Sequence, residues 1–253
     1  MKTTMLKAGL IGAVSLLGIA PAFADEGTWG GFSAGVTGTT DYRFRGISNS
    51  DNGPAIQPWV QYDHKSGLFV NVWGSNIDFD DDATYDSNIE VDFTLGYNHA
   101  FSDNTTGTAK VVYYWYADAD APAGFPDYDY WDFIVGLEHD FGEASVSAEL
   151  AYSPDNFAET GDSVALVGGI DIPVAETFLF FNKGLAISTH VGHQWLDIGE
   201  DYLWYDLGAT ATWNNVSVDL RWVDTDISNV DCAGPSDICD GTVVLSVSAS
   251  WGG

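Results

Sequence analysis

Hydrophobic and polar residues alternate with a period of two along most of the chain. In residues 144–152 every second residue is apolar, and the residues between them are mostly serine or glutamate. The same alternation recurs in residues 89–97, 216–222 and 242–251. Successive side chains of a β-strand point to opposite faces, so this period predicts strands with one apolar and one polar face. Beyond residue 24 no segment has convincing helical periodicity, and we predict an all-β protein.

The alternating segments predict about twelve strands, an even number as in single-chain bacterial outer-membrane barrels. They are roughly 9–13 residues long, which suits a tilted membrane-crossing strand better than the usual 5–6 residues of a soluble sheet. The least regular piece, Pro173 to Gly184, is either a long turn or the extension of a strand. The expected strands are 29–43, 54–63, 67–77, 88–100, 106–117, 129–139, 143–153, 163–173, 185–195, 202–213, 216–226 and 241–252.

Alternation alone fits a soluble β-sandwich equally well, because any half-buried strand alternates. The polar face, however, carries small and charged residues on nearly every strand, as the wet lumen of a membrane barrel requires. Tryptophan and tyrosine also concentrate near the expected strand ends, where barrels have aromatic girdles. We therefore predict a transmembrane up-and-down antiparallel β-barrel. The expected girdle residues include Trp29, Tyr42, Trp59, Trp73, Tyr113 to Tyr116, Trp131, Trp195, Tyr202 to Tyr205, Trp213, Trp222 and Trp251.

The N-terminus has the pattern of an export signal. Lys2 and Lys7 precede the apolar run Ala8 to Ala20, and Ala22-Phe23-Ala24 has the small-x-small pattern of a cleavage site. We predict a cleaved secretory signal peptide over residues 1–24 and one outer-membrane barrel domain over residues 25–253. An N-terminal membrane anchor is the alternative, but the apolar run is short for a spanning helix.

The connections between the expected strands alternate in length. Short links, such as Asp140-Phe141-Gly142, separate longer ones around 44–53, 77–87, 118–128, 154–162, 196–201 and 227–240. Outer-membrane barrels have short periplasmic turns and longer external loops, so we place the long links outside the cell. They are also acidic. The expected external acidic loop contains Asp78, Asp80, Asp81, Asp82 and Asp86, and further aspartates surround the two cysteines.

The chain carries 37 acidic residues against eight lysines and arginines, a formal net charge of −29. Nucleic acid is excluded as a partner, because its binding relies on basic residues that neutralise phosphates. Such a negative field instead attracts cations, although an acidic surface adapted to a saline habitat fits the composition as well.

The candidate pore constriction is the motif Asp41-x-Arg43-x-Arg45. At period two all three side chains face the same side as Ser33, Thr37 and Thr39, and therefore the lumen. Rings of charged residues set selectivity in pores, so these arginines are candidates for a filter. A structural salt-bridge plug is the equally weighted alternative. The other expected pore-lining charges are Glu90, Asp92, Lys110, Asp132, Glu149, Asp219 and Arg221.

Three further features of the chain could carry chemistry. Cys232 and Cys239 predict a local disulfide in an exported chain. The run Asp78-x-Asp80-x-Asp82 lacks the glycine and the glutamate of a calcium loop, so we expect a solvated acidic loop and no resident metal. Ser188 and His190 lie two residues apart without a nucleophile elbow, so we expect neither catalysis nor a cofactor.

Several short motifs together resemble those of a known protein family. The stretch Thr40 to Ser48 (TDYRFRGIS), followed by Val72 to Phe79 (VWGSNIDF), Tyr152 to Asp155 (YSPD) and Trp222 to Asp226 (WVDTD), resembles the TorF-type porin family, also called the Gcw_chp family. The resemblance covers essentially the whole chain after residue 24, and TDYRFRGIS is its most specific part. It implies an outer-membrane barrel with a porin role and leaves the solute open.

We therefore predict a porin that allows passive diffusion of small hydrophilic solutes through a polar lumen with an acidic external mouth. Expected partners are outer-membrane lipid and small solutes of cationic or zwitterionic character, and the oligomeric state stays open. The alternative function is a non-conducting structural or adhesive barrel that acts through its loops.

Overall fold

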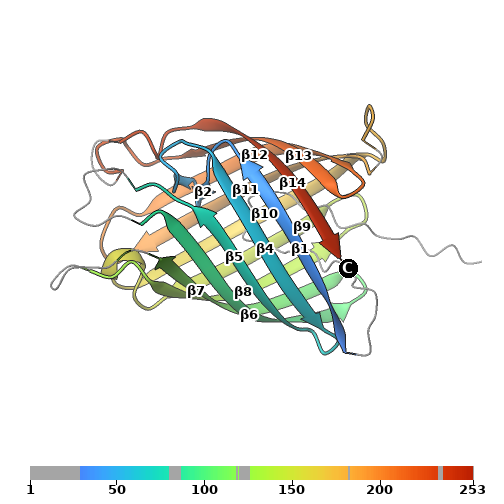
Figure 1. The fold of residues 1–253 in the computed structure, drawn as a ribbon, viewed down its shortest axis with the longest axis horizontal. Coiled ribbons are helices and arrows are strands. Elements are labelled where there is room, and N and C mark those ends of the chain that lie inside the picture. The colour runs from blue at the N-terminus through green and yellow to red at the C-terminus, as the bar shows by residue number, and fades with distance from the viewer. Residues whose placement is uncertain are drawn as a thin grey trace, which may run out of the picture.

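The computed structural model describes residues 29–79, 87–117, 119, 126–181, 183–232 and 236–252, and its fold is a closed antiparallel barrel (Figure 1). The expected signal peptide and four members of the expected acidic loop, Asp80, Asp81, Asp82 and Asp86, lie outside the described residues. Among the residues that are described, no helix has the length and apolar character to span a membrane.

Twelve strands close the barrel in the order β1-β14-β13-β12-β11-β10-β9-β8-β7-β6-β5-β4, with β4 pairing back to β1. The predicted twelve-stranded antiparallel barrel is confirmed. The wall strands are β1 (Gly30–Thr39), β4 (Ala55–His64), β5 (Leu68–Asn76), β6 (Ile89–Ser102), β7 (Thr105–Ala117), β8 (Tyr130–Asp140), β9 (Ser145–Ser153), β10 (Ser163–Ala175), β11 (Leu185–Leu196), β12 (Tyr202–Trp213), β13 (Val216–Thr225) and β14 (Thr242–Gly252).

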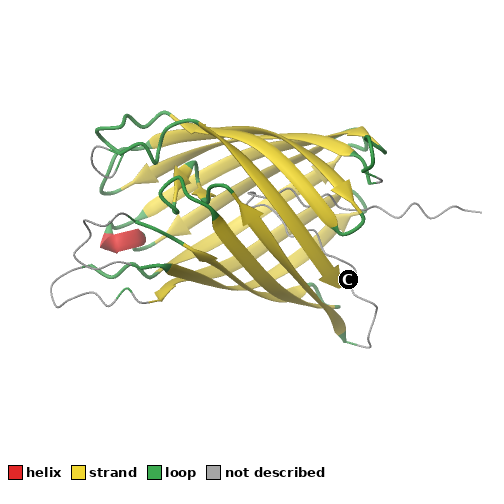
Figure 2. Cartoon of the chain, turned by 45° about the horizontal axis from the view of Figure 1, so that its top comes forward, coloured by secondary structure: helices red, strands yellow, loops and turns green. Residues whose placement is uncertain are grey.

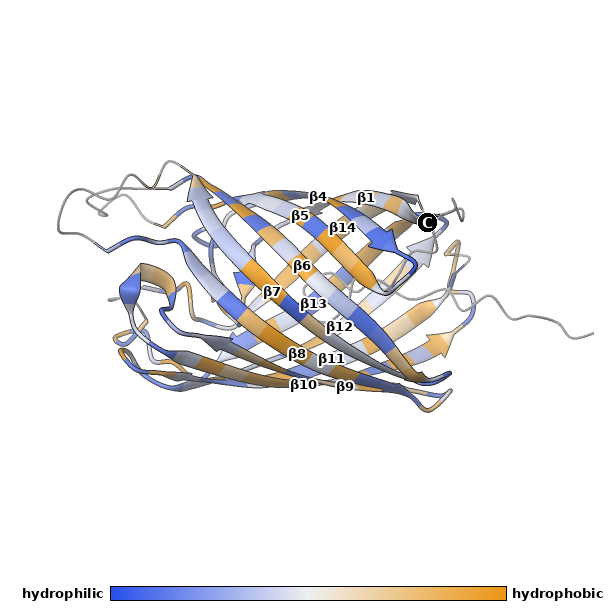
Figure 3. Ribbon diagram, turned by 90° about the horizontal axis from the view of Figure 1, so that it is seen from below, coloured by the Kyte–Doolittle hydropathy of each residue, from blue (hydrophilic) through white to orange (hydrophobic). Residues whose placement is uncertain are grey.

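The two faces of the wall differ as the alternation predicts, and Figure 3 shows hydrophobic and hydrophilic residues alternating along the strands. Large apolar side chains such as Phe32, Leu95 and Leu207 are more than half exposed on the outside. In water so extensive an apolar surface would be unfavourable, whereas a lipid bilayer accepts it. The barrel therefore has the outward face of a membrane-spanning protein.

The two ends of the barrel differ in their connections. We call one the turn end, where β4 and β5, β6 and β7, β8 and β9, and β12 and β13 are joined by short turns. The other is the loop end, where the longer connections lie and where Figure 2 shows the short 3-10 helix η1 (Phe157–Glu159). The connection after β10 is the exception at the turn end. The irregular piece Pro173 to Gly184 is both a strand extension and a turn. Strand β10 continues to Ala175, and a turn closed by Phe178 and Phe181 follows.

Two expectations about the first strand and its loop are wrong. The strand predicted over 29–43 ends at Thr39, and residues 44–53, expected as an external loop, fold into the barrel. There β2 (Arg43–Phe44) and β3 (Ile47–Ser48) form a separate two-stranded sheet. The alternation continues past Thr39 in sequence, but the backbone turns away from the wall because its polar side chains find partners inside the lumen.

Part of the expected aromatic girdle also lies elsewhere. Trp115, Trp131, Trp195, Trp213 and Trp222 are exposed on the outside. The girdle prediction is wrong for seven aromatic residues that lie in the barrel interior instead. They are Tyr42, Trp59, Trp73, Tyr114, Tyr116, Tyr202 and Trp204. Proximity to a strand end does not decide which face of the wall a ring occupies; its phase in the alternation does.

Candidate functional site

Residues 40–54, which we call the lumen hairpin, leave the wall after β1 and rejoin it at β4. Their tip is a tight turn at Arg45 and Gly46, with φ values of 48° and 88°. A Cβ atom at Gly46 would lie 2.5 Å from the Thr225 methyl group and 2.8 Å from Trp204 Cβ, so only glycine fits this approach to β12 and β13. Arg45 has a left-handed backbone that costs a non-glycine residue of order 1–3 kcal/mol, which the surroundings must offset.

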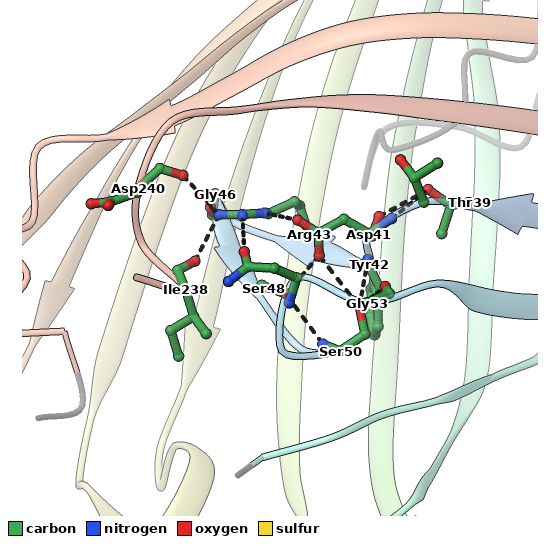
Figure 4. A network of polar contacts seen from close by, with 12 residues as sticks. Thr39, Asp41, Tyr42, Arg43, Gly46, Ser48, Ser50, Gly53, Ile238 and Asp240 are labelled. Carbon is green, nitrogen blue, oxygen red and sulfur yellow. Dashed lines mark hydrogen bonds and ion pairs between the residues drawn. The ribbon is translucent and has the colours of Figure 1, made fainter. Parts of the chain in front are cut away.

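The Asp41 carboxylate and the Arg43 guanidinium hold the hairpin together (Figure 4). Arg43 Nε donates to Asp41 Oδ2 at 2.5 Å, and the Ser48 hydroxyl donates to Asp41 Oδ1 at 2.6 Å. Arg43 Nη1 also donates to the carbonyl oxygens of Ile238 at 2.7 Å and Asp240 at 3.1 Å. These two carbonyls belong to the connection between β13 and β14, so Arg43 ties the hairpin to the loop end of the barrel.

The connection that receives Arg43 is itself cross-linked. Cys232 and Cys239 form a disulfide within it, and both residues are 2% exposed. The Cys239 carbonyl oxygen accepts a hydrogen bond from the Thr225 hydroxyl at 2.9 Å. The disulfide therefore limits the conformations of the loop segment on which Arg43 rests.

Arg45 spans the lumen to the opposite wall. Its Nη2 donates to Asp132 Oδ2 on β8 at 2.6 Å, and its Nη1 donates to Gln194 Oε1 on β11 at 3.1 Å. The side chains of Arg45 and Asp132 are 2% and 0% exposed. Burial lowers the pKa of Arg45, but Asp132 and the surrounding tyrosines together raise it by more, so the net pKa lies above its ordinary value. The guanidinium stays charged and pins the hairpin tip.

The remaining basic side chains of the interior, Lys110 and Arg221, are paired along the wall. Lys110 Nζ on β7 lies 3.2 Å from Glu149 Oε2 on β9. Arg221 contacts both Asp206 and Asp219, the latter at 3.2 Å, and donates to the Ser188 hydroxyl at 2.7 Å. Each of the four basic side chains that the structure describes inside the barrel thus contacts at least one carboxylate.

His190 and Ser188 do not form a nucleophile and base pair. His190 Nδ1 lies 3.0 Å from both carboxylate oxygens of Asp206, whereas the Ser188 hydroxyl is held by Arg221. Within one strand these side chains share a face, but they are directed to different partners on β12 and β13.

The predicted site residues are therefore brought together only in part. Three pairs of opposite charge form among the expected pore-lining residues, namely Arg45 with Asp132, Lys110 with Glu149, and Arg221 with Asp219. The expectation that Asp41, Arg43 and Arg45 share one strand face is wrong, because the two arginines reach different walls from a folded hairpin. Glu90 contacts Tyr42 Oη at 3.0 Å.

Part of the loop end of the lumen is apolar, which differs from the polar lumen that the alternation predicted. A cluster of inward-facing residues fills it beside the hairpin, and we call it the lumen aromatic cluster. Within it the rings of Tyr114 and Tyr130 stack with centroids 4.3 Å apart, and Phe44 of the hairpin meets Tyr114 edge to face. Its buried members are Tyr42, Ala55, Ile77, Val112, Tyr114, Tyr116, Tyr130, Ile134, Ala151 and Ala165.

Between the hairpin and the turn end the lumen contains a cavity of about 300 Å³, which we call the lumen cavity. Arg43, Phe44 and Arg45 form part of its wall, together with amides and aromatic rings from β4, β5, β6, β7 and β12. Sequence reasoning missed the aromatic and amide members. Their position in the alternation could have identified them, because Trp59 shares its face of β4 with Gln57 and Gln61. The missed members are Gln57, Trp59, Gln61, Phe69, Asn71, Trp73, Asn98 and Trp204.

Solved structures with similar folds are outer-membrane barrels. The KdgM porin aligns with a TM-score of 0.54 at 10% identity, over 87% of this chain and 99% of that one. The NanC porin aligns at 0.50 and 10% identity, over 86% and 97%. LpxR from Salmonella typhimurium, an enzyme, aligns at 0.51 and 7% identity, over 87% and 100%. At such identities the likeness shows the fold, a closed barrel like those of these outer-membrane proteins, and the architecture alone does not separate channel from enzyme.

The family is defined by sequence. Residues 25–251 match Gcw_chp, described as a bacterial protein of unknown function, and the chain belongs to this family. No curated protein matches the sequence.

Proposed function

We propose that this chain is an outer-membrane porin, exported by a signal peptide over residues 1–24, through which small hydrophilic solutes diffuse passively. The observation that carries the proposal is the lumen cavity, a space of about 300 Å³ beneath a folded-in hairpin in a closed barrel. A hairpin inside the lumen narrows the path without breaking the wall, which is how a barrel of this size can select solutes. The KdgM porin has also been solved in complex with disordered oligogalacturonate, a hydrophilic solute.

The charges at the loop end support entry of cationic or zwitterionic solutes. Its described connections contain Asp127, Asp226, Asp231 and Asp237. Asp78 adds a further carboxylate there, and its backbone forms a β-bridge with Ser50 of the hairpin. A negative mouth raises the local concentration of positively charged groups, whereas Arg43 and Arg45 deeper in the path orient carboxylates.

Conductance in a planar lipid bilayer tests the proposal directly. The refolded protein should produce discrete steps of current in salt solution, and the steps should be smaller than those of a wide, unobstructed porin. A protein that migrates as a folded, heat-modifiable barrel but gives no current steps would end the porin hypothesis.

Arg45→Ser should make the channel more cation-selective. The substitution removes a positive charge from the constriction and leaves Asp132 unpaired, so the lumen becomes more negative. We expect the ratio of potassium to chloride permeability, from reversal potentials in a salt gradient, to rise roughly threefold or more. Arg43→Ser should act in the same direction.

Lys183→Ser is the matched control, because it removes one positive charge from an exposed turn outside the lumen. Its reversal potential should equal that of the unaltered protein. If Arg45→Ser and Lys183→Ser behave alike, Arg45 has a structural role only.

A specific observation favours a second candidate, a non-conducting structural or adhesive barrel. The lumen aromatic cluster and the hairpin occupy the loop end together, and Arg43 and Arg45 pin the hairpin with charged hydrogen bonds. On this alternative the hairpin is a permanent plug, and the bilayer measurement separates the two functions.

A further inference from the structure

Three aromatic side chains of the lumen cavity lie flat along the barrel wall. Trp59, Phe69 and Trp204 pair across the sheet with Gly35, Gly96 and Gly192. A Cβ atom at each of these glycines would lie 2.6, 2.2 and 2.3 Å, respectively, from the nearest ring atom. Each ring therefore folds over the neighbouring strand into the space that a side chain would fill, instead of projecting across the lumen. Such pairs also stabilise a sheet, but here the rings border an open cavity.

The same cavity collects buried polar atoms that lack a partner. Within the described chain, five atoms of cavity-lining residues form no hydrogen bond to the protein. Gln61 and Asn71, which supply two of them, are only 2% and 6% exposed. A buried polar group without a partner is costly, so a group that stays unpaired within a protein commonly serves a water or a ligand. The five atoms are Arg45 Nε, Gln61 Oε1, Asn71 Nδ2, Asp92 Oδ1 and Trp204 Nε1.

These five atoms are mixed in hydrogen-bonding character. Arg45 Nε, Asn71 Nδ2 and Trp204 Nε1 are donors, whereas Gln61 Oε1 and Asp92 Oδ1 are acceptors. A hydroxyl group both donates and accepts, so a ligand with several hydroxyls can satisfy atoms of either kind. A carboxylate or a phosphate only accepts, and an ammonium only donates.

Most of the charged groups on the cavity wall are already paired within the protein. Arg43 pairs with Asp41, Arg45 with Asp132, and Lys110 with Glu149. On the other side Asp206 pairs with Arg221, whereas Asp92 lies on the wall with its Oδ1 unpartnered. An anionic ligand would have to break one of these buried pairs to gain a counter-ion, which is unfavourable. An ammonium could contact Asp92, but it only donates and would leave the donors Asn71 Nδ2 and Trp204 Nε1 unsatisfied.

We propose that the lumen cavity is a binding site for a single uncharged polyhydroxylated molecule, of the class of a monosaccharide or a small polyol. The rings of Trp59 and Trp204 contact its carbon-bound hydrogens, and Gln61 and Asn71 hydrogen-bond its hydroxyls. A volume of about 300 Å³ lies at the low end for ligand pockets, which limits the occupant to one small molecule. The site adds an uncharged class to the charged and zwitterionic solutes that the mouth of the proposed porin favours, and it rests on that function only for its biological purpose.

Binding is tested on the full chain refolded in detergent micelles, by titration with glucose and sorbitol under intrinsic tryptophan fluorescence and calorimetry. Glucuronate and glucosamine serve as acidic and basic probes of the same size. We expect saturable binding of glucose or sorbitol at millimolar concentration, and weaker binding of both charged probes. Stronger binding of a charged probe, or no saturable binding of any probe, would overturn the assignment.

Two variants test the residues. Trp59→Leu removes a ring and Gln61→Leu removes a hydrogen-bonding amide, and each should weaken the binding of the uncharged probe about tenfold. Trp115→Leu, on the outward face, is the matched control and should leave the affinity unchanged. Heat-modifiable migration shows which variants fold, and equal affinity in folded Trp59→Leu, Gln61→Leu and control protein would contradict the site.

The outcome is separable from that of the proposed function. Binding in micelles needs no conduction, so a barrel without current steps can still bind glucose. Conversely, current steps without saturable binding would leave the porin standing and remove the binding site.

Discussion

Replacing residues 40–54 with a two-residue Asn-Gly turn should raise the single-channel conductance several-fold. Thr39 and Ala55 are direct partners in the β1–β4 ladder, so a tight turn can join them without disturbing the wall. The removed hairpin is the segment whose Arg45 reaches β8 and β11 on the opposite wall. Its loss opens the lumen beside the aromatic cluster. Current steps in planar bilayers, compared at equal salt, measure the effect.

A matched control shortens a connection without touching the lumen. Residues 176–184 join β10 and β11 at the turn end, and replacing them with a short turn should leave the conductance unchanged. Gly46→Val is a milder second variant, because a side chain there collides with Thr225 and Trp204 and displaces only the hairpin tip. Unchanged conductance in a folded variant without the hairpin would mean that the constriction lies elsewhere.

Arg221→Met should destabilise the barrel by roughly 3–5 kcal/mol, the range for breaking a buried ion pair from one side. Arg221 is 1% exposed and contacts Asp206, Asp219 and Ser188. Its removal leaves two carboxylates buried against the wall with less positive charge to offset them. Equilibrium unfolding by urea in lipid vesicles, followed by tryptophan fluorescence, measures the change in the free energy of unfolding.

Removing the whole charge set provides the decisive comparison. The triple variant Asp206→Asn, Asp219→Asn and Arg221→Met should recover most of the lost stability, since no uncompensated charge remains. Lys183→Met, in an exposed turn, should change the free energy of unfolding by less than about 0.5 kcal/mol. A small effect of Arg221→Met would show that water reaches these carboxylates in the folded barrel.

The barrel itself follows from the sequence because its cause is local. A strand that separates lipid from a lumen must alternate its side chains, and residues 144–152 or 242–251 do so without interruption. The same rule placed Asp132, Glu149 and Asp219 on the inner face, where their carboxylates are buried. Long and short connections then distinguished the two ends, apart from the long link after β10.

The end of β1 could not be predicted from the same rule. Asp41, Arg43 and Arg45 continue the alternation of the strand, yet the chain leaves the wall after Thr39. What decides the turn is the set of partners for Arg43 and Arg45, which lie as far along the chain as Asp132, Gln194 and Ile238. Period two reports which side of a strand a residue faces, and it holds no information about distant partners.

The motif Asp41-x-Arg43-x-Arg45 thus identified charged side chains that lie inside the lumen, whereas their geometry and the cavity beneath them depend on the tertiary structure. Sequence alone determined the barrel, its inner and outer faces and most of the residues that carry its interior charge, because each follows from neighbours a few positions apart. The inward hairpin, the pairing of Trp59 with Gly35 and of Trp204 with Gly192, and the unpartnered amides of Gln61 and Asn71 were decided only in three dimensions. The physical reason is that register and closure bring together residues whose separation in sequence has no local signature.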